Sequence, residues 1–311
     1  MEVSPLPLDS KIVSENQLVL EYKDVSLYLK REDLIHPEVS GNKWRKLKYN
    51  LIEAQEQGYK TLLTFGGAYS NHIAAVASAG KHYKFSTIGI IRGEELSDKI
   101  QENPTLQFAV ENGMKLYFVS RQQYNRKESA DFLEKISEQF GNFYLLPEGG
   151  TNTLAIKGCE EILGEGDSAF NYICSSVGTG GTLTGLLNSA GKNQVVLGFP
   201  ALKGDFAENM FTKFANKGKS AQLITDYHFG GYGKTTFELI EFINCFYRSY
   251  NIKLDPVYTG KMLFGIVDLI KQGFFKRGTS ILAIHTGGIQ GIAGMNAQLI
   301  KKKQSIIDFY D

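Results

Sequence analysis

Short runs of apolar and β-branched residues recur along the 311-residue chain, separated by segments whose apolar residues have helical spacing. Several runs are almost continuously apolar, which is typical of strands buried on both faces of a parallel sheet. The expected strands are 26–32, 61–67, 86–93, 115–120, 143–150, 171–178, 194–200 and 280–288. This alternation of strand and helix predicts an α/β protein with open parallel sheets.

At least four of the expected strands run directly into turns rich in Gly, Ser, Thr or Asn. These turns are FGGAYSNH, PEGGTN, SSVGTGGT and IHTGGIQG. In open α/β sheets the carboxyl ends of the strands form the ligand crevice. One Gly-Gly turn is equally well explained as a tight connection. Four of them at strand ends favour a site for a small, polar, anionic ligand.

The turn within SSVGTGGTLTGLLNSA, residues 175–190, is the strongest individual signal. Its glycines allow successive backbone N–H groups to converge on an anion, and the following helix adds the dipole of its N-terminus. No Gly-Lys-Ser/Thr follows, and Leu183 stands where GxGxxG requires its last glycine, so nucleoside triphosphates and NAD are disfavoured. A single phosphate group is the predicted ligand, with a tight turn that binds nothing as the alternative. The residues concerned are Gly178, Thr179, Gly180, Gly181 and Thr182.

The stretch VSGNKWRKLKYN, residues 39–50, carries three lysines on an expected helix over 43–57. At about 100° per residue, Lys46 falls well away from the apolar face, and we expect it in solvent. Lys48 flanks that face farther along the helix, and we expect its ammonium to snorkel toward water. The apolar face consists of Trp44, Leu47, Leu51 and Ala54.

Lys43 flanks the same face but lies in the first turn, after Asn42 as the expected N-cap. The positive end of the helix dipole and apolar neighbours both disfavour a charged amine there, so we expect a lowered pKa. A neutral amine is what Schiff-base chemistry requires. An ordinary exposed lysine remains the alternative on these grounds alone.

Composition argues against several other classes of protein. Lys plus Arg is 34 and Asp plus Glu is 33, and the net charge of +1 gives no attraction to nucleic acid or an anionic membrane. We expect neither a secretory signal nor a membrane span, which would need roughly 18 apolar residues in a row. The scattered Cys159, Cys174 and Cys245 argue against disulfides and a zinc site. They favour buried or partly buried free thiols in a reducing cytoplasm.

Together, the phosphate loop, the Schiff-base lysine and the Ser-Asn turn resemble the pyridoxal-phosphate (PLP) enzymes of the tryptophan-synthase-β type (fold type II). Within them the chain is most similar to the branch of 1-aminocyclopropane-1-carboxylate (ACC) deaminase and D-cysteine desulfhydrase. The matching motifs follow the family's order from about residue 30 to 290. They are KREDLIHPEVSGNKWRKL, TFGGAYSNHIAAVA, PEGGTNTLAIKG, SSVGTGGTLTG, GGYGKTT, LDPVYTGKMLFGIVDLI and IHTGG.

The resemblance implies how the cofactor and the substrate carboxylate are held. Lys43 would form the Schiff base with PLP, and Asn71 would bond the cofactor's 3-hydroxyl. The loop from Gly178 to Thr182 would hold the phosphate. Ser70, Asn71 and His72 would meet the substrate carboxylate through side chains and backbone N–H groups.

The resemblance also assigns residues around the reacting carbon. Tyr232 in GGYG and Tyr258 in DPVY would face the substrate. Thr259 would lie at the pyridine nitrogen, with Thr286 of HTGG nearby. The alternative for each tyrosine is a half-buried ring with its hydroxyl in water. His72 is equally explained as a satisfied histidine at a helix start.

Three positions favour the D-cysteine desulfhydrase side of the branch. ACC deaminase has Glu, Leu and Gln where this chain has Thr259, Thr286 and His72. A hydroxyl cannot keep a proton on the pyridine nitrogen as a carboxylate does. The resemblance therefore implies a lyase that releases pyruvate, ammonia and sulfide from D-cysteine by α,β-elimination. The alternatives are ACC deaminase, another reaction of the superfamily (racemase, dehydratase, β-replacement) and a non-catalytic binder of a phosphate or amino-acid ligand.

The expected architecture is two open-sheet α/β domains with PLP in the cleft between them. Residues 1–50 plus 153–311 would form the larger, PLP-binding domain and residues 51–152 the smaller one. The family resemblance implies a homodimer. Trp44 and Tyr69 depart from the family pattern, and a bulky side chain at either position would narrow or re-aim the pocket.

Overall fold

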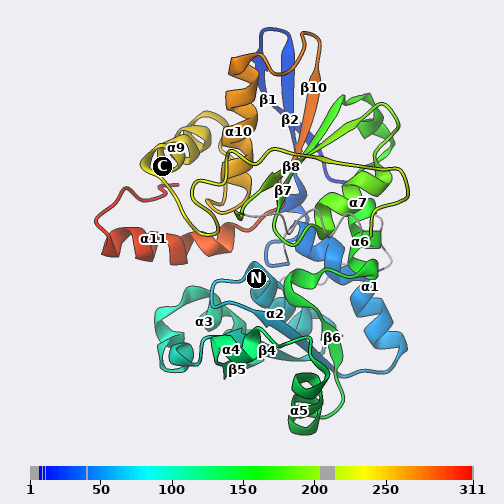
Figure 1. Cartoon of the computed structure of the whole chain (residues 1–311), viewed down its shortest axis with the longest axis vertical. Coiled ribbons are helices and arrows are strands. Elements are labelled where there is room, and N and C mark those ends of the chain that lie inside the picture. The colour runs from blue at the N-terminus through cyan, green and yellow to red at the C-terminus, as the bar shows by residue number, and fades with distance from the viewer. Residues whose placement is uncertain (1–6, 9, 11, 40, 204–213, 310–311) are drawn as a thin grey trace.

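The structure, a computed structural model, describes residues 7–8, 10, 12–39, 41–203 and 214–309. The chain forms two bodies that lie one above the other, each built on its own sheet (Figure 1). One sheet has six strands and the other has four. The prediction of two open-sheet α/β domains is confirmed, and each of the expected runs contains a strand.

The larger sheet has the strand order β1-β2-β10-β7-β8-β9. All neighbours pair in parallel except β1 and β2, which form an antiparallel hairpin. Its strands are β1 (Asn16–Tyr22), β2 (Val25–Lys30), β7 (Tyr172–Val177), β8 (Val195–Pro200), β9 (Gln222–Leu223) and β10 (Ser280–Ile284). The sequence did not predict β1, because this edge strand is mostly exposed or half-buried and lacks an apolar run.

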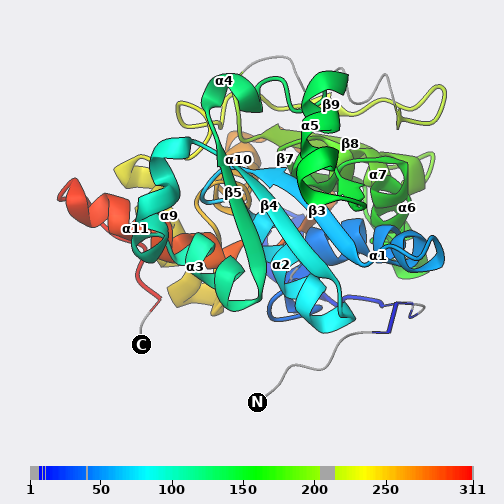
Figure 2. The same ribbon diagram turned by 90° about the horizontal axis from the view of Figure 1, so that it is seen from below.

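The smaller sheet has the order β5-β4-β3-β6, and all its strands are parallel. Figure 2 shows this sheet from below. Its strands are β3 (Thr61–Gly66), β4 (Ser86–Arg92), β5 (Met114–Val119) and β6 (Tyr144–Leu146). Leu62, Leu63 and Ile90 are fully buried, as the apolar runs predicted for strands covered on both faces.

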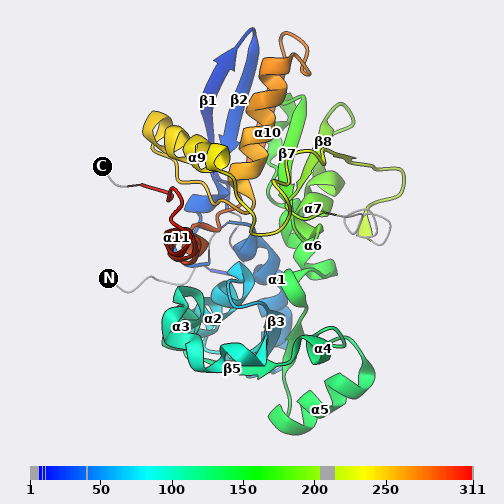
Figure 3. The same ribbon diagram turned by 60° about the vertical axis from the view of Figure 1, so that its left-hand side comes forward.

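Helices cover both sheets, and α1 runs from the larger body toward the smaller one (Figures 1 and 3). In the larger body they are α6 (Thr153–Glu160), α7 (Gly181–Ser189), α9 (Phe237–Tyr250), α10 (Thr259–Gln272) and α11 (Ile292–Lys301). In the smaller body they are α2 (Asn71–Tyr83), α3 (Pro104–Glu111), α4 (Arg121–Tyr124) and α5 (Ala130–Phe140). Short 3-10 helices are η1 (Glu32–Leu34), η2 (Glu94–Glu102), η3 (Glu148–Gly150), η4 (Glu165–Ala169) and η5 (Ile289–Gly291).

Helix α1 (Asn42–Glu56) packs against both α6 and α2 and so joins the two bodies. Its predicted apolar face is fully buried in the core of the smaller body. The chain crosses between the bodies along α1 and returns through η3 and α6. We propose a division into 1–50 plus 153–311 and 51–152, because it assigns each sheet to one unit.

Candidate active site

A cavity of about 470 Å³ lies between the two bodies. Its wall includes residues from all four glycine-rich turns that follow β3, β6, β7 and β10. Parallel strands of each sheet end at the same edge, so these turns converge although they are far apart in sequence. The predicted site residues in the wall are Lys43, Ser70, Asn71, His72, Gly178, Thr179, Gly180, Thr182, Tyr232, Tyr258 and Thr286.

Two of the predicted site residues do not line the cavity. Gly181 is buried, and a Cβ there would lie 2.8 Å from the side chain of Thr151. Thr259 is also buried, and its hydroxyl donates to the carboxylate of Asp255 at 2.6 Å and accepts from the Asp255 N–H at 3.0 Å. The hydroxyl of Thr259 is therefore engaged at the start of α10.

The Ser-Gly-Asn turn positions Lys43 by a close backbone approach. Gly41 has a φ of 60°, and a Cβ there would lie 2.2 Å from the carbonyl oxygen of Thr286. Asn42 was expected to cap the helix, but Gly41 occupies the cap position and Asn42 is the first helical residue. The Asn42 amide instead donates to the Thr182 hydroxyl at 2.9 Å. This bond ties the lysine helix to the glycine-rich loop.

Lys43 extends into the cavity, and burial lowers the pKa of its amine to about 7, with the charge of Lys46 as the second cause. The expected lowering of this pKa is confirmed. None of the ion pairs among the described residues involves Lys43. A large fraction of the amine is consequently neutral near pH 7.

Lys46 was expected in solvent, and this prediction is wrong. The residue is 3% exposed and lines the cavity one helical turn from Lys43. Its ammonium donates to the Gly149 carbonyl at 3.0 Å and to the hydroxyls of Thr151 at 3.0 Å and Thr179 at 3.3 Å. Helical periodicity recognises only the face that carries apolar residues, whereas the packing of α6 and its preceding turn buries a second face of α1.

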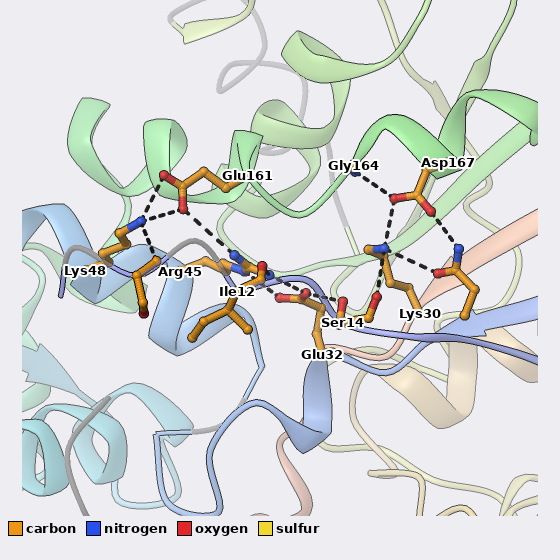
Figure 4. Close-up of polar contacts among 11 residues, drawn as sticks. Ile12, Ser14, Lys30, Glu32, Arg45, Lys48, Glu161, Gly164 and Asp167 are labelled. Atoms are coloured by element: carbon orange, nitrogen blue, oxygen red, sulfur yellow. Dashed lines mark hydrogen bonds and ion pairs between the residues drawn. The ribbon is translucent and has the colours of Figure 1, made fainter. Parts of the chain in front are cut away.

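The ammonium of Lys48 does not reach solvent, so the expected snorkelling is also wrong. It pairs with Glu161 at 2.8 Å and donates to the Ser10 carbonyl at 3.2 Å. Arg45, on the same side of α1, makes a bidentate bond to Glu32, with both distances 2.8 Å (Figure 4). These contacts hold α1 to η1, to the end of α6 and to the N-terminal segment.

The glycine-rich loop leads into α7, which has no side-chain cap. Gly180 has a φ of 82°, and Gly178 lies so close to Tyr258 that a Cβ would be 3.1 Å from the ring. With no capping side chain, the first-turn N–H groups of α7 are available to an anion. Lys46 contacts Thr179 of this loop, which places a positive charge beside those donors.

The Ser70–Asn71–His72 turn begins α2. The Ser70 hydroxyl caps the helix by accepting from the backbone N–H groups of His72 at 3.2 Å and Ile73 at 3.3 Å. The His72 ring is buried, its Nε2 lies 2.9 Å from the Thr64 hydroxyl, and its Nδ1 has no partner among the described residues. Burial and, secondarily, the charges of Lys43 and Lys46 hold the pKa of His72 well below its usual range. The imidazole is therefore neutral.

Asn71 joins the two walls of the cavity. Its amide packs against the turn after β10, where a Cβ on Gly288 would lie 2.8 Å from the amide nitrogen. Tyr232 and Tyr258, which also line the cavity, form an edge-to-face pair with ring centroids 6.1 Å apart. Burial, followed by the neighbouring Tyr232, raises the pKa of Tyr258 well above its usual range.

Lys261 supports the loop that carries Tyr232. It is 2% exposed, and its ammonium donates to the carbonyls of His228 at 2.9 Å and Gly231 at 2.8 Å. Phe229, Gly230, Gly231 and Gly233 in this loop all have positive φ angles. We infer that Lys261 stabilises this conformation, because the two carbonyls share one charged donor.

Sequence reasoning missed two charged residues of the smaller body's wall, Arg92 and Glu148. Both could have been found from the sequence, because each lies at or just after the carboxyl end of a strand, where ligand-binding side chains gather. Tyr69 lines the cavity, and a Cβ on Gly294 would lie 2.6 Å from its ring. Trp44 does not line it; its ring is buried and stacks on Tyr83.

Three further observations concern the cysteines, possible metal sites and possible membrane spans. Cys159 and Cys174 are buried free thiols as expected, whereas Cys245 is exposed. In the described part of the chain, no cluster of three or more His, Cys, Asp or Glu residues could hold a metal ion. None of the described helices is long and apolar enough to cross a membrane.

Comparisons with known proteins identify the family. Residues 3–287 match the model for pyridoxal-phosphate dependent enzymes. The chain is 33% identical over 287 residues to a Pyrococcus horikoshii protein named provisionally as an ACC deaminase, with 85% of each chain covered. It is 32% identical over 295 residues to the mitochondrial bifunctional D-cysteine desulfhydrase/ACC deaminase of Arabidopsis thaliana, covering 86% of this chain and 73% of that one. The solved structure of an ACC deaminase homologue matches with a TM-score of 0.77 at 27% identity, over 96% of this chain and 95% of that one.

The chain therefore belongs to the family of pyridoxal-phosphate-dependent enzymes, in the group that includes ACC deaminases and D-cysteine desulfhydrases. Its cofactor is PLP. The cavity fits PLP, because it contains an amine with a pKa of about 7, an uncapped helix start and a buried ammonium. The first can bond an aldehyde, and the other two suit a phosphate.

Proposed function

We propose that this enzyme is a lyase that acts on small D-amino acids, D-cysteine first, by α,β-elimination. The observation that carries the proposal is the meeting of Lys43, the glycine-rich loop and the Ser70 turn in one cavity. In this proposal the loop from Gly178 to Thr182 and Lys46 hold the phosphate of PLP, and Lys43 bonds its aldehyde. Asn71 lies at the 3-hydroxyl, and Tyr232 and Tyr258, which also line the cavity, face the substrate.

The residues of the chain then act on the substrate in a defined order. The Ser70–His72 turn holds the α-carboxylate, with the Ser70 hydroxyl as a hydrogen-bond donor. Bound PLP provides an electron sink for negative charge at the substrate α-carbon. The substrate amine would take the place of Lys43 on the aldehyde carbon, which releases the Lys43 amine. The freed amine would then remove the α-proton as general base, which its lowered pKa permits near pH 7. The Cβ–S bond breaks, sulfur departs as hydrosulfide, and one water is consumed to give pyruvate and ammonia.

Preference for elimination over ACC ring opening rests on the position after Tyr258, which carries no acidic residue in this chain. ACC has no α-hydrogen, and the resembling ACC deaminase pattern has a carboxylate after this tyrosine. Here Thr259 takes that position and turns to Asp255. Among the described residues of the wall, Glu148 is the only carboxylate, and both its oxygens are engaged, by Tyr124 at 2.8 Å and Lys127 at 3.1 Å.

The test is to incubate PLP-loaded enzyme separately with D-cysteine, L-cysteine, D-serine and ACC and to measure pyruvate and sulfide. We expect pyruvate and sulfide in equal amounts from D-cysteine. Pyruvate from ACC with none from D-cysteine would instead support the hypothesis that the enzyme is an ACC deaminase. ACC deamination is the second candidate function, because it is the activity in the name of the Pyrococcus horikoshii relative.

Two broader alternatives are separated by the same preparation. Racemisation, dehydration or β-replacement would use the same cofactor. Dehydration would give pyruvate from D-serine without sulfide, whereas racemisation and β-replacement would give other amino acids. A non-catalytic binder would show no PLP absorbance after purification, and borohydride would fix no PLP to Lys43. We further propose a homodimer in the cytoplasm, which sedimentation and cell fractionation would test.

A further inference from the structure

Arg92 ends β4 and lines the cavity from the smaller body. A Cβ on Gly67, just before the Ser70 turn, would lie 3.7 Å from a guanidinium nitrogen of Arg92. The guanidinium also lies over the ring of Tyr124, 5.7 Å from its centroid. Tyr124 is 2% exposed, so it gives Arg92 a fixed support at the edge of the cavity.

Arg92 has no acidic partner among the described residues. The nearest carboxylate of the wall, Glu148, is already neutralised by Lys127 and accepts from the Tyr124 hydroxyl. Arg92 itself is exposed to the solvent that fills the cavity. A cation held in a binding wall without a counter-charge is free to bind an anion that enters with a ligand.

The other two cations of the wall have different tasks. Lys43 bonds the cofactor aldehyde, and Lys46 lies against Gly149, Thr151 and Thr179 at the glycine-rich loop. Arg92 lies beside Gly67, just ahead of the Ser70 turn at which the proposed function places the substrate α-carboxylate.

We propose that Arg92 determines substrate specificity by binding a negatively charged group on the substrate side chain. The site then prefers amino acids with a second negative charge at the β or γ position, such as a thiolate, a carboxylate or a phosphate. This inference rests on the proposed function in one respect, because it takes the α-carboxylate to be held at the Ser70 turn.

The test compares D-aspartate with D-asparagine, which have the same shape and differ in side-chain charge. Equilibrium binding of each to the PLP-loaded enzyme is measured by calorimetry. We expect D-aspartate to bind about fivefold or more tightly than D-asparagine, a modest preference because the guanidinium is exposed. Arg92→Gln should abolish the preference, and Arg92→Lys should keep part of it. Added salt should reduce it in the unmodified enzyme.

The matched control is Arg121→Gln. It removes the same charge from the smaller body at an exposed ion pair with Glu95, outside the cavity wall. We expect it to leave both affinities unchanged. Equal weakening of both ligands by Arg92→Gln would overturn the proposal, because Arg92 would then serve the α-carboxylate. The absence of any preference in the unmodified enzyme would overturn it as well.

These outcomes are independent of the proposed reaction, since neither ligand has to turn over. No pyruvate from D-cysteine together with a preference for D-aspartate would reject the lyase and retain the Arg92 site. If Arg92→Gln does not fold, two other measurements test whether Arg92 binds the side-chain anion. One is the salt dependence in the unmodified enzyme, and the other is Tyr124→Leu, which removes the support of Arg92. Tyr124→Leu should weaken D-aspartate and leave D-asparagine unchanged.

Discussion

Helix α1 carries cations on two faces, and the faces differ in whether carboxylates neutralise these cations. On one face Arg45 and Lys48 are neutralised by Glu32 and Glu161 (Figure 4). On the other face Lys43 and Lys46 make no ion pair with any described residue. Both faces are built from the same residue types within six positions of sequence.

The difference separates a structural role from a functional one. Burying a charge is costly unless a partner and hydrogen bonds compensate for it. Arg45 and Lys48 have that compensation from the fold itself. The charges of Lys43 and Lys46 are compensated only in part, by hydrogen bonds and a lowered pKa, and in the proposed function the anionic cofactor completes the compensation.

The substitution with the largest expected effect is Lys43→Ala, on the face that lines the cavity. We expect kcat for pyruvate formation from D-cysteine to fall about 100- to 10 000-fold or more, because the general base is lost. Borohydride should no longer fix the cofactor to the protein. Lys48→Ala on the other face is the control, and we expect it to lower stability while activity per folded molecule is retained. An equal loss of kcat in folded Lys48→Ala would contradict the assignment.

Glu32→Gln tests the structural face. It leaves Arg45 buried with only the more distant carboxylate of Glu161, at 3.8 Å, so the free energy of unfolding should fall by about 3 kcal/mol. Chemical denaturation of the apoprotein measures this change. The double substitution of Glu32 and Arg45 by leucine should recover much of the loss, because no unpaired charge remains. A neutral effect of Glu32→Gln would show that the pair does not anchor α1.

Lys46→Met tests the functional face without touching the base. Affinity for pyridoxal phosphate should fall about 10- to 100-fold, because a hydrogen-bonding cation beside the phosphate is removed. Equilibrium dialysis against pyridoxal, which lacks the phosphate, provides the control, and that affinity should change little. The apoprotein should lose less stability than Glu32→Gln does. An equal loss for both ligands would place Lys46 outside the phosphate site.

The smallest expected effect is the pH dependence of apoprotein stability. The pKa of Lys43 is about 7 when folded, against an ordinary value of 10.5, so between these pH values the unfolded chain binds one more proton. Stability must then rise with pH, by at most about 1.4 kcal/mol per pH unit from this residue. Denaturation of the wild-type protein and of Lys43→Met at pH 7.5 and 8.5 isolates this contribution. A difference that stays flat or falls with pH would contradict the lowered pKa.

Much of the site was predictable because its signals are local. The strand-end turns could be read from glycine and small polar residues that follow apolar runs. Parallel strands then place those turns together. Lys43 stood out by its place in a helix start, and the structure puts it in the cavity with the glycine-rich loop.

What could not be predicted depends on distant neighbours. Lys46 was expected in solvent because its face of α1 carries no apolar stripe, yet Gly149 and Thr179 cover it from more than 100 positions away. Thr259 lies at the start of α10, but Asp255 turns its hydroxyl out of the cavity. The support of Arg92 by Tyr124 joins β4 to α4, which no helical or strand spacing relates.

The class of fold, the family and the lysine proposed to bond the cofactor could be read from the sequence alone. Apolar periodicity and short motifs are enough for these, because they act within a few residues of the chain. Which cations of α1 are neutralised and which line the cavity was decided by the tertiary packing. That decision follows from burial and from the placement of carboxylates, and both are set by elements that meet only when the two bodies pack against α1.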